Sequence, residues 1–213
     1  MYRPVHFDET RVDILHQAIR AHSLGLLIRN GSEGLTADSI PFLVADGPAD
    51  FGRLQAHVAR ANPLWKELKD GDDVLVVFQG PQHYITPSWY LTKQETGKVV
   101  PTWNYVMVQA HGRITIRDDA AYVGAQMRAL TEAHEGDRAK PWAVDDAPAD
   151  FLAMQMRAIV GIEIEITRLI GKWKVSQNRP VADREGVVRG LAEETDADAA
   201  PMRAEVAAFL PRD

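Results

Sequence analysis

The clearest structural pattern in the chain is the stretch Val160-Gly161-Ile162-Glu163-Ile164-Glu165-Ile166-Thr167. Apolar residues alternate here with Gly, Glu and Thr, which is the two-residue period of a β-strand with one buried face. A second stretch, Val74-Leu75-Val76-Val77-Phe78, is apolar throughout and predicts a strand covered on both faces. Together the two stretches predict a core built on a β-sheet.

Around these strands, the sequence predicts further strands at residues 24–29, 35–45, 51–58 and 105–117. Helices are predicted at residues 9–22, 62–69 and 181–191, from Asp118 with Val123, Met127 and Leu130 on one face, and from Pro148 with Phe151 and Met154. Asp8 is expected to cap the first helix, and turns are expected at Asn30-Gly31 and Asp46-Gly47-Pro48. Strands dominate without regular strand–helix alternation, so the expected fold is mainly β with peripheral helices (α+β), an antiparallel barrel.

The chain shows no linker and no internal repeat. We expect residues 1–191 to form one domain and residues 192–213 to form an acidic, Ala-rich C-terminal helix or tail. Pro201 is a candidate start for a helix in this tail. The tail is expected either to be disordered or to dock on a partner subunit.

The composition is that of an ordinary globular protein, with 213 residues, of which 46% are hydrophobic and 25% charged. The absence of cysteine excludes disulfides, thiolate metal sites and cysteine nucleophiles. The net charge of −6, with Lys and Arg scattered, argues against a protein dominated by phosphate contacts with DNA. The N-terminus does not look like a secretory signal, and no apolar run approaches transmembrane length, so we expect a cytoplasmic protein without membrane contact.

A polar and aromatic stretch at residues 80–105 is the main candidate for a binding site. It contains two of the five Trp and three of the five Tyr, interspersed with hydroxyl and amide side chains and with three prolines. A buried strand would not usually carry so many polar groups, because each must find a hydrogen-bond partner. The stretch suits a flat, anionic ligand with polar edges, or else it is a rigid loop that closes a small barrel.

A second candidate lies where a predicted strand runs into a helix, at His57, Arg60 and Asn62. Free backbone N–H groups at a helix start and a guanidinium are both attractive to phosphate. In the alternative interpretation Asn62 only caps the helix, Arg60 is solvated and His57 packs against the sheet.

Three further groups of polar and aromatic residues have both a ligand-binding and a structural interpretation. They are Ser88, Trp89, Tyr90 and Lys93, then Trp103 and Asn104, and finally Ser176, Gln177, Asn178 and Arg179. The first suits a phosphate with a ring system, or an anchored surface loop. In the second, Trp103 and Asn104 either contact the edge of a bound heterocycle, or Trp103 is a core residue and Asn104 hydrogen-bonds a loop backbone. The third suits a lid from the same or the partner chain, or a plain loop.

Several familiar chemical motifs are missing. The sequence has no Gly-rich phosphate loop and no nucleophile elbow. Its seven histidines are dispersed, and no pair has the helical spacing of metal ligands. The sequence therefore names no catalytic residue and no metal site, and it leaves open whether the protein is an enzyme.

Taken together and in this order, these segments resemble the PaiB family of FMN-binding negative transcriptional regulators. The matching segments are Met1-Tyr2-Arg3-Pro4 with Phe7, His57-Val58-Ala59-Arg60-Ala61-Asn62-Pro63-Leu64-Trp65, Phe78-Gln79-Gly80-Pro81, Tyr84-Ile85-Thr86-Pro87-Ser88-Trp89-Tyr90, Val100-Pro101-Thr102-Trp103-Asn104-Tyr105 and Lys174-Val175-Ser176-Gln177-Asn178-Arg179. The family often has His at the position of Ser39 and Ser at the position of Thr86. Thr86 keeps a hydroxyl, whereas Ser39 lacks the imidazole.

The resemblance implies a split barrel like that of pyridoxamine-phosphate oxidases, assembled as an obligate-type homodimer with FMN at the interface. It implies that His57, Arg60 and Asn62 hold the phosphate, that the aromatic stretch surrounds the flavin, and that residues 176–179 approach it from either chain. DNA binding is implied by the resemblance only. A flavin-dependent oxidoreductase acting on a small molecule and an FMN carrier without turnover are the alternatives.

Overall fold

The computed structural model of the protein describes residues 1–32, 34–47 and 49–211. Its α-helices are α1 (Val12–Ala21), α2 (Leu64–Glu67), α3 (Leu91–Thr96), α4 (Ala120–Glu135), α5 (Ala149–Arg157), α6 (Val181–Glu193) and α7 (Ala199–Ala207), with short 3₁₀ helices at Val5–Phe7, Pro87–Trp89 and Val144–Asp146. Its strands are β1 (Asp8–Glu9), β2 (Leu24–Gly31), β3 (Gly34–Pro41), β4 (Leu43–Ala45), β5 (Arg53–Ala59), β6 (Asp73–Ile85), β7 (Thr102–Arg117) and β8 (Ile159–Lys174). The predicted mainly β architecture with helices is confirmed.

The strands form one sheet in the order β3-β2-β6-β7-β8-β5-β4, and β1 adds to β8. The pairs β2–β3, β2–β6, β4–β5 and β5–β8 are all antiparallel. The two ends of this order, β3 and β4, are separated in the chain only by Phe42. No ladder joins β3 to β5 among the described residues, so the sheet that the sequence predicted as an antiparallel barrel does not close.

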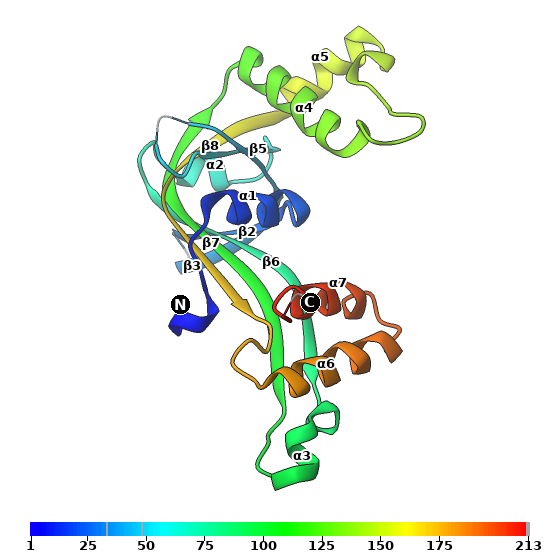
Figure 1. Ribbon diagram of the computed structural model, residues 1–213. Coiled ribbons are helices and arrows are strands. Elements are labelled where there is room, and N and C mark those ends of the chain that lie inside the picture. The colour runs from blue at the N-terminus through cyan, green and yellow to red at the C-terminus, as the bar shows by residue number, and fades with distance from the viewer. Residues whose placement is uncertain (33, 48, 212–213) are drawn as a thin grey trace. The chain divides into compact units, whose positions relative to one another are not determined.

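The chain divides into two compact units, and β6, β7 and β8 are long enough to run through both. Unit 1 contains residues 1–11, 79–108 and 170–213, and unit 2 contains residues 12–78 and 109–169. Figure 1 shows α6 beside α7 in unit 1, and α4 beside α5 in unit 2.

In unit 2, the central strands are buried on one face only. Val74, Val76 and Phe78 of β6 are buried, but Leu75 and Val77 are only half-buried. The expectation that this apolar run is covered on both faces is therefore wrong, because no described element covers its second face. On that face Leu75 and Val77 pair with Ile28 and Leu26, and Leu24 follows on β2. We call these five residues the open apolar face.

The strand predicted at residues 160–167 is confirmed as part of the longer β8, and its Val160, Ile162, Ile164 and Ile166 are fully buried. Strand β5 pairs with it from Arg53↔Glu165 to Ala59↔Ile159. Glycines let neighbouring elements approach this strand closely. A Cβ at Gly161 would meet the Tyr122 ring at 2.5 Å, and the Tyr122 hydroxyl donates to the Ile162 carbonyl over 2.9 Å. The first part of β8 therefore docks α4 on one side while it pairs with β5.

In unit 1, the N-terminal segment adds to the far end of β8 rather than capping a helix. Asp8 pairs with Lys172, so the prediction that Asp8 caps the first helix is wrong, and α1 begins only at Val12. Helices α6 and α7 pack together, with Met202 and Val206 of α7 fully buried. The indole of Trp173 donates to Glu205 of α7 over 3.1 Å. The segment after residue 191 therefore contains a helix, α7, which packs through Ala199, Met202 and Val206.

The structure also corrects other local expectations. Gly31 pairs with Gly34, so Asn30 and Gly31 lie inside the β2–β3 ladder and not in a turn. Asp119, not Asp118, caps α4 by accepting the Tyr122 N–H at 2.7 Å, because Asp118 is paired elsewhere. Phe151 and Met154 of α5 are about half exposed. The predicted turn at Asp46-Gly47-Pro48 includes Pro48, which lies outside the described residues.

Among the helices that the structure describes, none combines the length and apolar character needed to cross a membrane.

The packing of Trp89 against α6 gives a direct test of unit 1. A Cβ at Gly186 would collide with the Trp89 carbonyl oxygen, which is backbone and has little freedom to move aside. We expect Gly186→Ala to lower the free energy of unfolding by about 1–3 kcal/mol, as overpacking does. Urea denaturation followed by circular dichroism measures the change.

The matched control is Gly124→Ala in α4, where a new Cβ would lie 3.6 Å from the Met156 sulfur, an ordinary contact. Alanine is the better helix former, so this variant should gain about 0.5–1 kcal/mol. Equal effects of the two substitutions would contradict the packing of Trp89 on α6.

Candidate functional site

A hollow of about 320 Å³ opens in unit 2 where β3 and β5 face each other without pairing. Its lining is formed by Asp38, Ser39, Ile40, Pro41, His57, Val58, Ala59, Asn62 and Ile159. Two of the three residues predicted to hold phosphate, His57 and Asn62, lie here. Ser39, at a position where the resembled family often has His, lies in the same lining.

The His57 ring is oriented from behind by α4. Its Nδ1 lies 2.6 Å from the Oε1 of Gln126, which is buried. The described residues show no hydrogen bond to the Nε2 of His57. The amide nitrogen of Gln126 is buried without a partner among the described residues. A buried hydrogen-bond donor without a partner therefore lies behind His57.

Asn62 makes two contacts that fix its side chain. Its Oδ1 accepts the Leu64 N–H at 2.9 Å, and its Nδ2 lies 3.3 Å from the Asp38 carboxylate. The predicted helix is real, but α2 has only four residues, so its dipole is small. One of its free N–H groups is already used by Asn62, and the helix end offers less to an anion than the sequence suggested.

The Asp38 carboxylate in the hollow is balanced by a buried arginine. Arg29 lies between Asp38 and Glu67, with nitrogen–oxygen distances of 3.7 and 2.5 Å. Its side chain is only 5% exposed. Sequence reasoning missed this ion pair network, because its members come from β2, β3 and α2.

Arg60 lies outside this lining and forms a bidentate ion pair with Asp118, at 2.9 and 2.5 Å. It also donates to the carbonyl oxygens of Arg157 and Ile159, at 2.8 and 3.1 Å. The hydrogen bonds from Arg60 hold the pKa of Asp118 below its ordinary value. Phosphate binding by Arg60, which stays a prediction, would require it to exchange its partner.

In unit 1, several predicted residues are brought into contact with each other. Lys93 donates to the Ser88 hydroxyl over 3.1 Å. The Arg179 guanidinium lies 4.8 Å from the centre of the Tyr90 ring. Tyr90 is buried, and burial raises the pKa of its hydroxyl. Trp89 packs on α6, as the anchored-loop interpretation expected.

Trp103 and Asn104 point to opposite faces of β7. Trp103 is 54% exposed and meets the edge of Tyr84, with ring centres 6.0 Å apart. Asn104 is buried and donates to the Ser176 hydroxyl over 2.9 Å. Ser176 has a left-handed backbone (φ 66°), and it is the only non-glycine among the described residues that does. Such a conformation is costly and is often found at functional sites.

The remaining polar loop residues differ in their roles. Gln177 folds back on its own loop, accepting the Val175 N–H at 2.8 Å, while Asn178 is exposed. The adjacent Lys174, which was not among the predicted site residues, donates to Thr102 and to the Trp103 carbonyl. Burial, with Lys172 and Arg179 nearby, lowers the pKa of Lys174. Lys174 thus contacts the start of the strand that carries Trp103 and Asn104.

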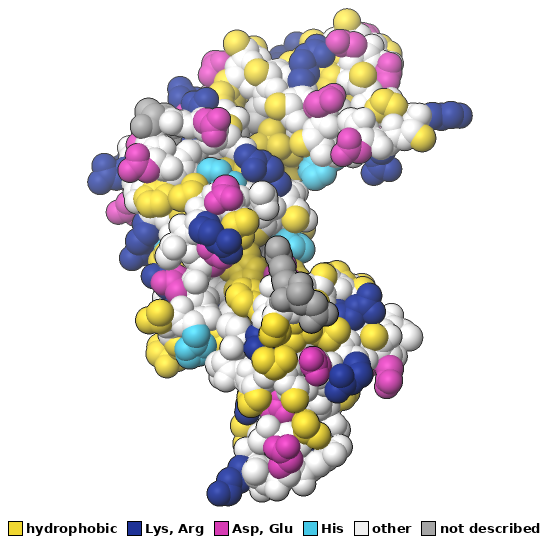
Figure 2. Space-filling model, viewed as in Figure 1, with side chains coloured by type: hydrophobic (Ala, Val, Ile, Leu, Met, Phe, Trp, Pro, Cys, Tyr) yellow, Lys and Arg dark blue, Asp and Glu magenta, His cyan; other side chains and the backbone are white. Residues whose placement is uncertain are grey.

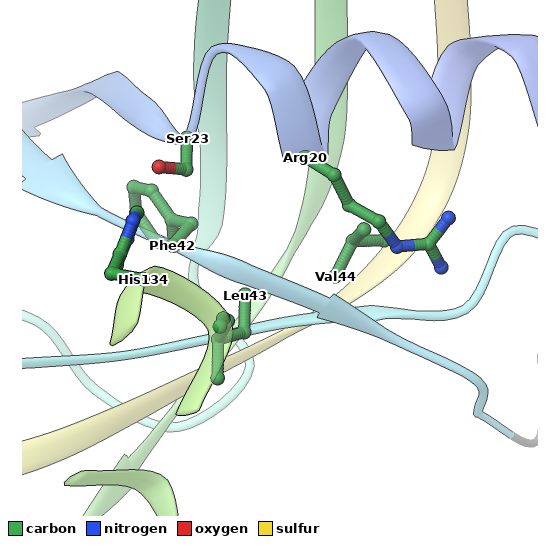
Figure 3. A pocket seen from close by; sticks show the side chains of 7 residues that line it. Arg20, Ser23, Phe42, Leu43, Val44 and His134 are labelled. Atoms are coloured by element: carbon green, nitrogen blue, oxygen red, sulfur yellow. The ribbon is translucent and has the colours of Figure 1, made fainter. Parts of the chain in front are cut away.

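Another hollow, of about 330 Å³, lies in unit 2 and is lined by Arg20, Ser23, Phe42, Leu43, Val44, Ala133 and His134. Figure 3 shows the Arg20 guanidinium pointing away from Ser23 and His134. Its charged group therefore does not converge with the other polar groups, and the walls that remain are largely apolar. Nothing in the sequence patterns pointed to this hollow.

This chain resembles known proteins both in sequence and in fold. Residues 1–168 match the family described as "Putative FMN-binding domain", and the chain belongs to this family. It is 37% identical to an uncharacterized protein of Aspergillus fumigatus, over 89% of each chain. It is 29% identical to the Protease synthase and sporulation protein PAI 2 of Bacillus subtilis, over 95% of this chain and 94% of that one.

Among solved structures, the flavocytochrome Anf3 from Azotobacter vinelandii has a similar fold, with a TM-score of 0.58 and 13% identity over 81% of this chain and 72% of that one. The predicted resemblance to the PaiB family is confirmed, and so is the predicted cofactor, because the family is FMN-binding.

The residues in the hollow fit this cofactor. A flavin nucleotide carries an anionic phosphate and a polyhydroxylated chain, which need hydrogen-bond donors and acceptors. The lining offers the imidazole of His57, the amide of Asn62 and the hydroxyl of Ser39, and its one carboxylate is balanced by Arg29.

The buried bond between Asn104 and Ser176 can be tested through stability. We expect Asn104→Ala to lower the free energy of unfolding by about 1–3 kcal/mol, because it leaves the Ser176 hydroxyl buried without its partner. Thermal and urea unfolding measure the loss. The control, Asn178→Ala, changes an exposed amide of the same loop region and should stay within about 0.5 kcal/mol of the parent. A loss no larger than the control's would show that the bond does not support the loop.

Proposed function

We propose that this protein is an FMN-binding homodimer that acts as a negative transcriptional regulator of the PaiB type. The observation that carries the proposal is the polar hollow between β3 and β5, lined by His57, Asn62 and Ser39, in a chain of an FMN-binding family. The regulatory part is supported by the likeness to the PAI 2 protein over 95% of the chain, whose name refers to protease synthesis and sporulation.

In this proposal the two sets of predicted residues have different tasks. His57, Arg60 and Asn62 bind the phosphate. The ring system is held by Ser88, Trp89, Tyr90, Lys93, Trp103 and Asn104, and residues 176–179 approach it from the same or the partner chain. Bound FMN supplies one- and two-electron redox chemistry. The protein's part is to bind the phosphate, orient the ring and donate hydrogen bonds to it.

The homodimer is supported by the open apolar face of unit 2. Leu24 and Leu26 are 65% and 38% exposed on β2, and Leu75 and Val77 beside them are half-buried. A contiguous apolar surface over the centre of a sheet is unusual for a monomer, and a second copy is a suitable cover. The split barrel that we propose has its opening between β3 and β5, where the ladder is interrupted.

An FMN-dependent oxidoreductase acting on a small molecule is the second candidate, and the charge distribution favours it. None of the described helices carries a basic face of the kind that enters DNA grooves. In α6, for example, Arg184 and Arg189 are accompanied by Asp183, Glu185 and Glu193. On the face shown in Figure 2, Lys and Arg side chains are interspersed with acidic ones.

The phosphate assignment can be tested by titrating FMN into two variants. If Arg60 binds the phosphate, Arg60→Ala should weaken FMN binding by about 1.5–3 kcal/mol, the value of a hydrogen bond to a charged group. Asp118→Asn should keep or improve the affinity, because it releases Arg60 from its ion pair. Quenching of flavin fluorescence gives both constants. If both variants lose affinity alike, Arg60 acts only by fastening the β5 corner, and the assignment fails.

The two functions predict different behaviour of the purified yellow protein. As a regulator, it should retain particular promoter fragments over random DNA, with affinity falling as salt rises. As an oxidoreductase, it should bleach on addition of NAD(P)H and recover its colour with an acceptor. Gel shift and anaerobic absorbance measure these outcomes, and gel filtration with light scattering gives the mass. DNA retention without sequence preference, together with rapid bleaching, would exclude the regulatory role.

A further inference from the structure

Three side chains of metal-binding type meet in unit 1, where the end of β6 approaches the link between α6 and α7. They are His83, Glu194 and Asp196, and one ligand atom from each lies within 4.8 Å of the others. None of the three was among the predicted site residues. The cluster makes no use of the residues assigned to FMN, so an inference about it does not depend on that proposal.

The hydrogen bonds of His83 fix which nitrogen faces the carboxylates. Its Nδ1 lies 2.6 Å from the carbonyl oxygen of Tyr84, which can only accept, so Nδ1 carries the proton. In a neutral ring the lone pair of Nε2 then points at Asp196, whose carboxylate oxygen is 2.9 Å away. Two atoms that each bind Zn²⁺ at about 2.0–2.2 Å lie roughly 3 Å apart, so this spacing suits two ligands of one ion.

The surroundings hold the cluster in the manner of a metal site. Histidine ligands usually donate their other N–H to a carbonyl or carboxylate, which fixes the ring, and the Tyr84 carbonyl has this role for His83. The His83 ring also lies beside the Trp89 indole, with centres 6.0 Å apart. Asp196 is oriented through its second oxygen, which accepts the Asp198 N–H at 3.1 Å.

We propose that His83, Glu194 and Asp196 bind a divalent transition-metal ion, Zn²⁺ in the first place, which fastens the α6–α7 pair to β6. An imidazole ligand disfavours Mg²⁺ and Ca²⁺, which take oxygen ligands, and suits Zn²⁺. Three protein ligands leave a coordination position for water, as in an open zinc site. Exposed Glu194 can turn toward the ion, since the described part of the chain shows no hydrogen bond or ion pair that holds it.

Isothermal titration with ZnCl₂ tests the proposal. The full chain is used without a polyhistidine tag, after dialysis against a chelator and then against a buffer that does not coordinate metals. We expect one Zn²⁺ per chain and a rise in the thermal midpoint when the ion is present, because binding favours the folded state. Absence of saturable one-to-one binding by the parent protein overturns the proposal.

Glu194→Gln is the decisive variant, because it removes an exposed ligand and keeps the His83–Asp196 contact, so the fold should be intact. It should weaken Zn²⁺ binding by more than about tenfold, since even the loss of a second-shell partner has that effect. Glu193→Gln, which changes an exposed acidic residue at the end of α6 outside the cluster, should bind as the parent does. Binding that is equal in the parent and in Glu194→Gln overturns the proposal.

Co²⁺ in place of Zn²⁺ reports on the histidine. It should give a visible absorption band in the parent protein that is lost in His83→Ala. Persistence of that band in a folded His83→Ala variant would place the ion elsewhere and overturn the assignment.

Discussion

The antiparallel pairing of β5 with the first part of β8 is the constraint on which the candidate phosphate site depends. The register places His57 opposite Gly161 and Ala59 opposite Ile159. Because Gly161 has no side chain, the Tyr122 ring packs against it and brings α4 close to the sheet. Helix α4 then places Gln126 against His57. A single ladder thus positions the strand, the helix behind it and the imidazole that lines the hollow.

The charges around this hollow are organised in two separate networks. Arg29 balances Asp38 and Glu67 from inside the core, so the carboxylate in the lining is not an isolated charge. Arg60 is instead held at the β5 corner by Asp118 and two backbone carbonyls. A buried ion pair is difficult to alter without leaving an unpaired charge, whereas an exposed pair exchanges readily. Arg60 is therefore the cation that can exchange its partner, whereas Arg29 stays paired with Asp38 and Glu67.

In unit 1, the aromatic stretch supports the structure and also retains groups suited to a ligand. Trp89 is locked against the glycines of α6, and Tyr90 is in the core. Trp103 remains exposed, while Lys174 and Ser176 are held close to its strand. Ser176 has a left-handed backbone conformation that glycine adopts more easily. The hydrogen bond between its hydroxyl and Asn104 gives a reason for serine at this position.

The sequence by itself determined the mainly β architecture, the strand at residues 160–167, the helix at residues 181–191 and membership in an FMN-binding family. These follow from patterns within one segment, or from motifs in a fixed order. Only the tertiary structure decided which polar groups satisfy each other. The bonds Asn104–Ser176, Arg60–Asp118 and His83–Asp196 join residues 72, 58 and 113 positions apart.

The same limit explains the errors of the sequence analysis. The apolar run at Val74–Phe78 shows that the strand has two apolar faces, but it does not show whether another element of the chain covers the second one. Aspartate is a good helix-capping residue, but Asp8 is paired with β8 in the sheet and Asp118 forms an ion pair with Arg60. A local sequence pattern shows which kinds of interaction a residue is able to make. Strand register and packing decide which distant partner it meets, because those contacts exist only once the sheet has formed.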